Sequence, residues 1–241
     1  MTRRLFMIAL LFAALPLRAE QALVAVAANF LKPAGVLASL YENESGHEIQ
    51  LASGSTGQHY AQILHGAPYD VFLAADDQRP LLLEEQGLAH GRFTYAVGRL
   101  AIFSADQNFP VAQGLEALKD EGFVAIANPA LAPYGRAAQE VLDATGLTEH
   151  LQGQVVQGQN VGQAFGMVAS GNARVGLVAM SMAQAAEGVF AVVPDDLHGP
   201  ILQDAVLLSH GKGNLAAQGF LAYLASDAAL VVLDDYGYAR P

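Results

Sequence analysis

Four short segments of this sequence carry the residue types of an anion-binding site at the start of a helix. In each segment, a strand-like run ends in small, hydroxyl-bearing or amide residues, and a helical pattern follows. The candidate residues, in chain order, are Ala28, Asn29, Ser55, Thr56, Pro133, Tyr134, Asn160 and Val161. The first N–H groups of a helix lack partners inside the helix, and together with the helix dipole they attract an anion. Small residues let the backbone approach the ion, and hydroxyl groups add donors.

Each segment taken alone also has a purely structural interpretation. Ser55 or Thr56 could simply cap a helix, and Pro133 is common at the first position of a helix. Asn29 could be an ordinary turn residue, and Val161 a core residue. One helix N-terminus contributes roughly 0.3–1 kcal/mol to binding an anion when it is exposed, and up to about 2 kcal/mol when it is partly buried. The hypothesis of a site therefore depends on four termini acting together.

Other chemistries fit the sequence less well. The motif "SGSTG" at residues 53–57 is not the Gly-x-Ser-x-Gly motif of a nucleophilic serine, and it lacks the lysine of a P-loop. His59 and His65 are six residues apart and do not share a helix face, which argues against a metal bound by side chains. Asp76 and Asp77 are better explained as a strand end and a helix cap than as an acid–base pair. We therefore expect neither an enzyme nor a bound cofactor.

The composition indicates an acidic protein with a sizeable core. Apolar residues make up 53% of the 241 residues, and 23 acidic residues outnumber 12 basic ones, which gives a formal net charge of −11. Such a chain is a poor partner for nucleic acid or for an anionic membrane. The sequence has no cysteine, so thiol chemistry and cysteine-bound metals are excluded. An acidic protein can still bind an anion if neutral donors line the site.

Residues 1–19 have the layout of a secretory signal peptide. Arg3 and Arg4 precede an apolar run over residues 5–15, and the small residue Ala19 follows. A membrane-spanning helix needs roughly 20 apolar residues, so this run is too short to be an anchor. Removal of residues 1–19 takes away three arginines and no acidic residue, which changes the formal charge from −11 to −14. We expect no other stretch of the chain to cross a membrane.

Strand-like and helical runs alternate along the rest of the chain. The strand-like runs span residues 23–30, 48–54, 69–75, 99–104, 123–129, 154–159, 174–180, 190–194 and 204–210, and a final helical stretch spans 215–234. Nearly continuous apolar strands between helices are typical of parallel sheets covered on both faces, and so of an α/β fold. The units are more numerous than one sheet needs, so we expect two sheets with the ligand between them. Ligands in such folds bind beyond the carboxyl ends of the strands, where the four segments lie.

Five longer segments, in this order, resemble one known family. They are "VAVAANF", "LASGSTGQHYAQILHGAPYDVFLAADD", "NPALAPYGRAAQEVL", "GQNVGQAFGMVASGNARVGLV" and "PILQDAVLLS". Together they are similar to the periplasmic molybdate-binding proteins of molybdate ABC transporters, and the resemblance covers essentially the whole chain after residue 19. It implies a type II periplasmic binding protein fold, with two α/β lobes, a ligand cleft between them and two crossover strands.

The resemblance also implies where the lobes divide and which residues hold the ion. Lobe one would comprise residues 20–95 plus 203–241, and lobe two residues 96–202. The oxyanion would be held by Ala28, Asn29, Ser55, Tyr134 and Val161, with Thr56 as a rival to Ser55. Many members of the family also use a tyrosine hydroxyl after "GIV", but here "GLV" is followed by Ala179. The pattern is similar to an asparagine-containing subgroup, in which the asparagine amide compensates.

The function implied by the resemblance is capture of molybdate and tungstate in the periplasm and delivery to a membrane permease. The protein would act as a monomer, without a cofactor and without nucleic acid. Two alternatives remain open from the residues alone. One is a binding protein for another ligand, such as sulfate, ferric ion or a small organic anion. The other is an enzyme on the same fold that uses Asp76, Asp77 and His198.

Overall fold

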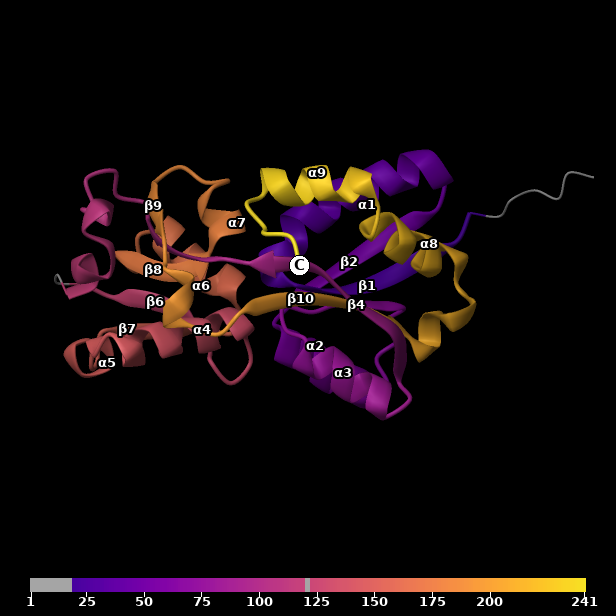
Figure 1. The fold of residues 1–241 in the computed structure, drawn as a ribbon, viewed down its shortest axis with the longest axis horizontal. Helices are drawn as coiled ribbons and strands as arrows, with labels where there is room; N and C mark the ends of the chain where they lie inside the picture. The colour runs from indigo at the N-terminus through magenta and orange to yellow at the C-terminus, as the bar shows by residue number, and fades with distance from the viewer. Residues whose placement is uncertain (1–18, 120–121) are drawn as a thin grey trace, which may run out of the picture.

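The computed structural model describes residues 19–119 and 122–241 of the chain. The predicted signal peptide, residues 1–19, lies outside the described residues except for Ala19. Two five-stranded sheets lie side by side along the long axis of the molecule, each with helices packed on it (Figure 1). The N- and C-terminal parts of the chain share one lobe, and the middle part forms the other. The predicted α/β fold with two lobes is confirmed.

Lobe one contains the sheet with strand order β2-β1-β3-β10-β4. Its strands are β1 (Gln21–Ala27), β2 (Glu48–Gly54), β3 (Val71–Leu73), β4 (Ala89–Gly98) and β10 (Ile201–Leu208). Lobe two contains the sheet with order β7-β6-β8-β5-β9. Its strands are β5 (Leu100–Ser104), β6 (Val124–Ala127), β7 (Val155–Gly158), β8 (Val175–Ala179) and β9 (Val189–Val192).

The sheets are mixed, so the expectation of parallel sheets is wrong for part of each. Strand β1 runs parallel to β2 and β3, but β10 runs antiparallel to β3 and β4. In lobe two, β6 runs parallel to β7 and β8, but β5 runs antiparallel to β8 and β9. The cause is the passage of the chain between lobes, since β5 and β10 enter their sheets from the other lobe. A strand buried on both faces is a continuous apolar run in either direction, so the sequence pattern does not report direction.

The helices lie in both lobes. Lobe one has α1 (Leu31–Ser45), α2 (Thr56–Leu64), α3 (Gln78–Glu85), α8 (Leu215–Leu224) and α9 (Asp227–Asp235). Lobe two has α4 (Pro133–Ala144), α5 (Leu147–His150), α6 (Val161–Ala169) and α7 (Met180–Ala183). The described residues also form four 3-10 segments: η1 (Ala28–Phe30), η2 (Val111–Lys119), η3 (Asp195–Leu197) and η4 (Ser209–Gly213).

The final helical stretch expected over residues 215–234 is two helices. The break falls before Ser226, whose hydroxyl accepts a hydrogen bond from the backbone N–H of Ala229 and so caps α9. Within the described residues, no single helix has the length and apolar character to cross a membrane. The pair α8 and α9, which is bent by 65°, meets those criteria of length and composition only when both helices are counted together.

Alternate side chains of β1 enter different cores, as expected for a strand covered on both faces. Val24 and Val26 pack in the cluster formed with α1, α8 and α9, and Ala25 packs in the cluster formed with α2 and α3. These two helix groups lie on opposite sides of the lobe-one sheet (Figure 1). Packing on both faces therefore holds β1 in the sheet, and its carboxyl end lies at the inner edge of the lobe.

Two strands carry the chain between the lobes. Strand β4 remains in the lobe-one sheet up to Gly98, and β5 begins in the other sheet after one residue. The buried Asp204 of β10 accepts hydrogen bonds of 2.6 Å from the guanidinium of Arg92 and from the hydroxyl of Thr94, both on β4. The lobe boundaries at 95/96 and 202/203 stay a prediction, and they fall within β4 and β10.

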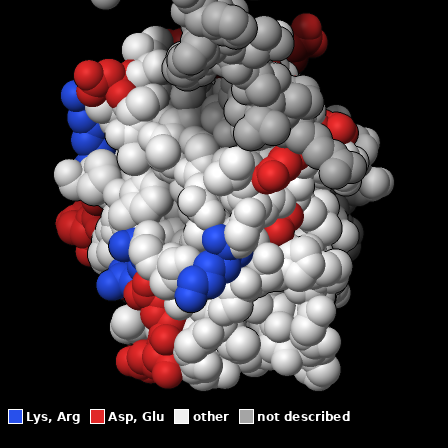
Figure 2. Space-filling model, turned by 90° about the vertical axis from the view of Figure 1, so that its right-hand side faces the viewer, with Lys and Arg blue, Asp and Glu red and all other residues white. Residues whose placement is uncertain are grey.

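The outer end of lobe one carries charges of both signs. Figure 2 faces this end and shows acidic and basic side chains interspersed among neutral ones where the described residues form the surface. The acidic excess of the chain is therefore not gathered into one patch on this face.

Candidate functional site

All six residues predicted to bind an oxyanion line one cavity. Ala28, Asn29, Ser55 and Thr56 come from lobe one, and Tyr134 and Val161 come from lobe two. The other lining residues are Ala27, Gly54, Ala75, Ala132, Pro133 and Asn160. Each group follows the carboxyl end of a strand, so four turns that are far apart in the sequence meet between the two sheets.

The size and polarity of the cavity suit a small ion. The space in it that a water-sized molecule can occupy is about 10 Å³, far below the roughly 300–1,000 Å³ of pockets for drug-sized ligands. All twelve lining residues in the described part of the chain are uncharged at neutral pH. The six predicted residues are between 1% and 9% exposed, so the site is shielded from water. In such a setting, backbone and hydroxyl donors act more strongly on an ion than they would in water.

Helix α2 leaves one backbone donor unused at the cavity. Ser55 and Gln58 form a capping box, in which the Ser55 N–H donates to Gln58 Oε1 (3.0 Å) and the Gln58 N–H donates to Ser55 Oγ (3.2 Å). The Gly57 N–H donates to the carbonyl of Leu131 (2.8 Å). The N–H of Thr56 has no acceptor among residues 19–119 and 122–241. It is therefore the donor that α2 offers to an anion.

Helix α4 presents a single donor for a different reason. Pro133 occupies the first helical position and has no N–H, and the Gly135 N–H donates to the carbonyl of Ala132 (2.9 Å). The Tyr134 N–H is left without an acceptor in the described chain. A Cβ at position 135 would lie 2.3 Å from the carbonyl oxygen of Ala127, so a glycine is needed for α4 to start this close to β6.

Helix α6 presents its donors beside a capping asparagine. Asn160 Oδ1 accepts a hydrogen bond from the N–H of Gln163 (3.0 Å). The N–H groups of Val161 and Gly162, at the first two helical positions, find no acceptor in the part of the protein described. The cap satisfies the third N–H of the helix and leaves the first two for an acceptor from outside the helix.

The hydroxyls of Ser55 and Thr56 both accept hydrogen bonds from the backbone. Ser55 Oγ accepts from Gln58, and Thr56 Oγ1 accepts from the N–H of Ala75 (3.0 Å). Because a hydroxyl that accepts keeps its own hydrogen, each can still donate. Either hydroxyl can therefore be the side-chain donor of this turn, whereas the backbone N–H without an acceptor in the described chain is that of Thr56. Ala75 was not predicted, and its methyl side chain gave no chemical signal in the sequence.

The side chain of Asn29 differs from the expectation that its amide donates to the anion. Its Nδ2 donates to Gln203 Oε1 (2.7 Å) and to the hydroxyl of Tyr238 (2.9 Å), which uses both of its hydrogens. The Tyr238 hydroxyl lies 3.1 Å from the Asn29 carbonyl, which also accepts from the hydroxyl of Ser181 (3.0 Å). Asn29 is therefore fixed on several sides, and its side-chain amide has no hydrogen left to donate to an ion.

The tyrosines around the cavity remain neutral. Burial raises the pKa of Tyr134 and of Tyr238 well above the usual value of a phenol. Neither hydroxyl places a negative charge near the cavity at physiological pH. Ala179, at the position of the family's tyrosine, ends β8, is fully buried and does not line the cavity.

The residues behind the enzyme hypothesis do not meet at the cavity. Asp76 Oδ1 accepts a hydrogen bond from the Arg79 N–H in the first turn of α3 (3.0 Å), and its carboxylate pairs with the Arg79 guanidinium. His198 Nδ1 lies 2.7 Å from the Gly199 carbonyl, at the end of η3. In the described ranges, no group of three or more His, Asp or Glu side chains is placed to hold a metal ion.

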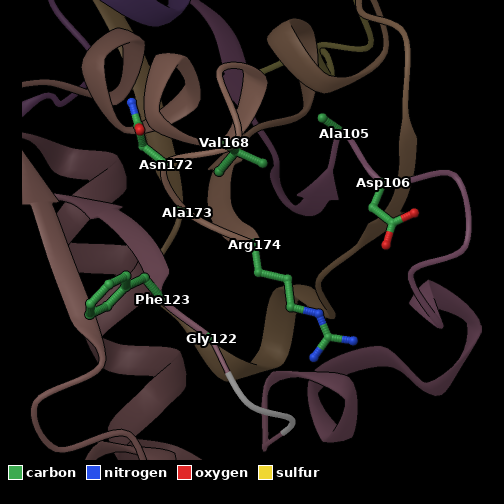
Figure 3. A pocket seen from close by; sticks show the side chains of 9 residues that line it. Ala105, Asp106, Gly122, Phe123, Val168, Asn172, Ala173 and Arg174 are labelled. Carbon is green, nitrogen blue, oxygen red and sulfur yellow. The ribbon is translucent and has the colours of Figure 1, made fainter.

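A wider hollow at the far end of lobe two is a poor candidate. Phe123 and Arg174 border it and stand just before β6 and β8, so it lies at the amino ends of those strands. Figure 3 shows the ring of Phe123 and the guanidinium of Arg174 extending in different directions. The guanidinium of Arg174 lies 5.3 Å from the centre of the Phe109 ring. Ligands of α/β sheets bind at the opposite, carboxyl edge.

The fold and the cavity agree with comparisons to known proteins. A family model for bacterial extracellular solute-binding proteins matches residues 22–239. The chain belongs to this family. The two lobes and the cavity between them are thus those of a solute-binding protein.

Two relatives and one solved structure are similar to nearly the whole of this chain, and they confirm the resemblance found in the sequence. A molybdate-binding protein of Azotobacter vinelandii is 45% identical over 229 residues, which cover 92% of this chain and 90% of the relative. A molybdate-binding protein of Rhodobacter capsulatus is 44% identical over 228 residues, which cover 93% of this chain and 90% of the relative. The solved structure of the periplasmic molybdate-binding protein of Azotobacter vinelandii matches with a TM-score of 0.86 at 37% identity, covering 91% of this chain and 99% of that one.

Proposed function

We propose that this protein binds molybdate or tungstate in the cavity between its lobes and delivers the ion to the permease of an ABC transporter. The observation that carries the proposal is a buried, uncharged cavity into which four turns present unpaired N–H groups and hydroxyls. Relatives of 44–45% identity that are named molybdate-binding proteins support the choice of ion.

The protonation state of the ion explains why neutral donors suffice. Molybdate is a fully deprotonated dianion at neutral pH, so it needs donors and no acceptor. Each helix N-terminus acts as about half a positive charge, and several of them aimed at one buried ion can compensate it without a cationic side chain. Phosphate keeps a proton near neutral pH and would need a carboxylate acceptor, and no carboxylate is among the described lining residues.

The wider setting belongs to the same proposal. The signal-like segment over residues 1–19 and the periplasmic relative support a periplasmic location. We infer that the protein acts there as a monomeric carrier, not as an enzyme, and without nucleic acid or a cofactor. The residues proposed to hold the ion are Ala28, Asn29, Ser55, Thr56, Tyr134 and Val161.

Titration calorimetry tests the ligand. Protein lacking residues 1–19 and stripped of bound anions is titrated in parallel with molybdate, tungstate, sulfate and phosphate. We expect tight one-to-one binding of molybdate and tungstate, with sulfate and phosphate much weaker. Tight binding of sulfate, or binding of none of the four, would overturn the proposal. Hydrolysis of a phosphate or sulfate ester by the pure protein would instead support an enzyme.

A further inference from the structure

Two hydrogen bonds join helices α2 and α3 of lobe one to the turn before α4 of lobe two, directly beside the cavity. The Gly57 N–H, in the first turn of α2, donates to the Leu131 carbonyl (2.8 Å). The Arg79 guanidinium donates through Nη2 to the Ala130 carbonyl (3.2 Å). Both donors belong to lobe one, and both acceptors belong to the turn that leads into α4 of lobe two. Neither donor lines the cavity, so these contacts hold the lobes together without contacting the ion.

Gly57 is a glycine because the other lobe comes so close. A Cβ on Gly57 would lie 2.8 Å from the Leu131 carbonyl oxygen, 3.1 Å from its Cα and 3.3 Å from Arg79 Nη2. Gly57 lies within α2, and its φ is not in the positive range that favours glycine. Alanine is the better helix former at such a position. The requirement for glycine therefore comes from the approach of lobe two and not from α2 itself.

Arg79 is positioned for its contact by a buried carboxylate. Asp76 is 2% exposed, accepts from the Arg79 N–H (3.0 Å) and pairs with the Arg79 guanidinium. This pairing aims the guanidinium and leaves Nη2 for the Ala130 carbonyl. It also neutralises the Asp76 charge close to a cavity that is to hold an anion.

Donors to the ion and contacts between the lobes alternate along the chain. In α2, the Thr56 N–H is left for the cavity and the next N–H, on Gly57, binds lobe two. In the facing turn, Leu131 supplies the carbonyl, and the Tyr134 N–H three residues later faces the cavity. Forming the contacts between the lobes therefore brings donors from both lobes to the same ion.

We propose that Gly57 and Arg79 act as positioning residues that form a latch, defined as their hydrogen bonds to the carbonyls of Leu131 and Ala130. The latch holds the lobes closed over the anion and sets how long the anion stays bound. The proposal rests on the proposed function, because it assumes that molybdate binding closes the lobes. The latch acts on dissociation, because it forms after the ion has entered.

Gly57→Ala tests the latch, with Gly35→Ala as its matched control. Gly35 lies on α1, and a Cβ there meets no atom within 4 Å. Molybdate affinity is measured by calorimetry, dissociation by stopped-flow mixing, closure by small-angle X-ray scattering and ligand-free stability by thermal unfolding. We expect Gly57→Ala to lower the affinity roughly tenfold or more, mainly through faster dissociation. With saturating molybdate it should be less compact than the wild type, whereas its ligand-free Tm should not fall.

Arg79 provides a second, independent variant. Arg79→Ala should speed molybdate dissociation, and Arg79→Lys should restore part of the loss because it keeps a donor near the Ala130 carbonyl. Gly35→Ala should behave as the wild type in every measurement.

The outcomes separate the latch from the proposed function. Wild-type protein that binds molybdate, together with Gly57→Ala protein that binds and closes equally well, would refute the latch alone. A Gly57→Ala protein whose ligand-free Tm falls along with its affinity would also contradict the latch, because it indicates a defect of α2. A wild-type protein that neither binds molybdate nor becomes more compact in its presence would refute the proposed function and the latch with it.

Discussion

Replacing Ser55 with alanine should separate its two roles, as a helix cap and as a donor to the ion. Its Oγ accepts the Gln58 N–H, so Ser55→Ala should destabilise the ligand-free protein by about 0.5–2 kcal/mol through the lost cap. If its hydroxyl hydrogen donates to the dianion, a hydrogen bond to a charged group is lost as well, worth about 1.5–3 kcal/mol. We therefore expect molybdate affinity to fall roughly 10–150-fold.

Thr56→Val provides the comparison, because valine keeps the shape and the backbone N–H of Thr56. The Ala75 N–H loses its acceptor in a buried position, so the ligand-free protein should lose about 1–3 kcal/mol of stability. If Ser55 supplies the hydroxyl donor and Thr56 contributes only its backbone N–H, which valine keeps, affinity should fall less than in Ser55→Ala.

A capping control and a paired assay complete the test. Ser226→Ala removes a cap of α9, and Ser226 does not line the cavity. It should lower stability without changing affinity. Urea unfolding without ligand gives the stability of each variant, and calorimetry with molybdate gives its affinity. If Thr56→Val loses more affinity than Ser55→Ala, the assignment of the hydroxyl donor to Ser55 is refuted.

Three further perturbations probe the surroundings of the site. Tyr238→Phe leaves one N–H of the buried Asn29 side chain without an acceptor, and urea unfolding should show a loss of about 1–3 kcal/mol. Burial lowers the pKa of His59 below its ordinary 6.5, so the unfolded chain binds this proton more readily. Stability should therefore fall as the pH drops below about 6.5. Between pH 7 and pH 5, the Tm of His59→Gln should fall less than the Tm of the wild type. Arg92→Met removes the cationic partner of the fully buried Asp204 and should cost about 3–5 kcal/mol; an unchanged urea midpoint would contradict this.

Local signals in the sequence predicted most of the elements and the candidate site residues, but not strand β4 (Ala89–Gly98), which is missing from the strand-like runs expected from the sequence. The capping box from Ser55 to Gln58, the proline at the start of α4 and the capping Asn160 all act within one helical turn. Their physical basis is short-range, so the sequence reports it directly. The alternation of apolar runs likewise predicted two α/β lobes. The resemblance to a known family then predicted that the four turns form one site.

Strand direction and the second partners of the site residues were not available from the sequence. Apart from Gln203 and Asp204, strand β10 is as apolar as a parallel strand would be, and only the return of the chain from lobe two makes it antiparallel. Likewise, the sequence pattern continued through Ser226 as one helix, whereas in the structure its hydroxyl caps the start of a second helix, α9.

Residue types along the chain define which turns can donate to an anion, whereas the folded structure defines which of those donors remain for the ion. The Asn29 amide is used by partners 174 and 209 residues away, and the Gly57 N–H is used by the other lobe. A hydrogen-bond donor serves whichever acceptor the folded chain brings to it. Residue type therefore fixes the capacity to donate, and packing over long sequence distances fixes the recipient.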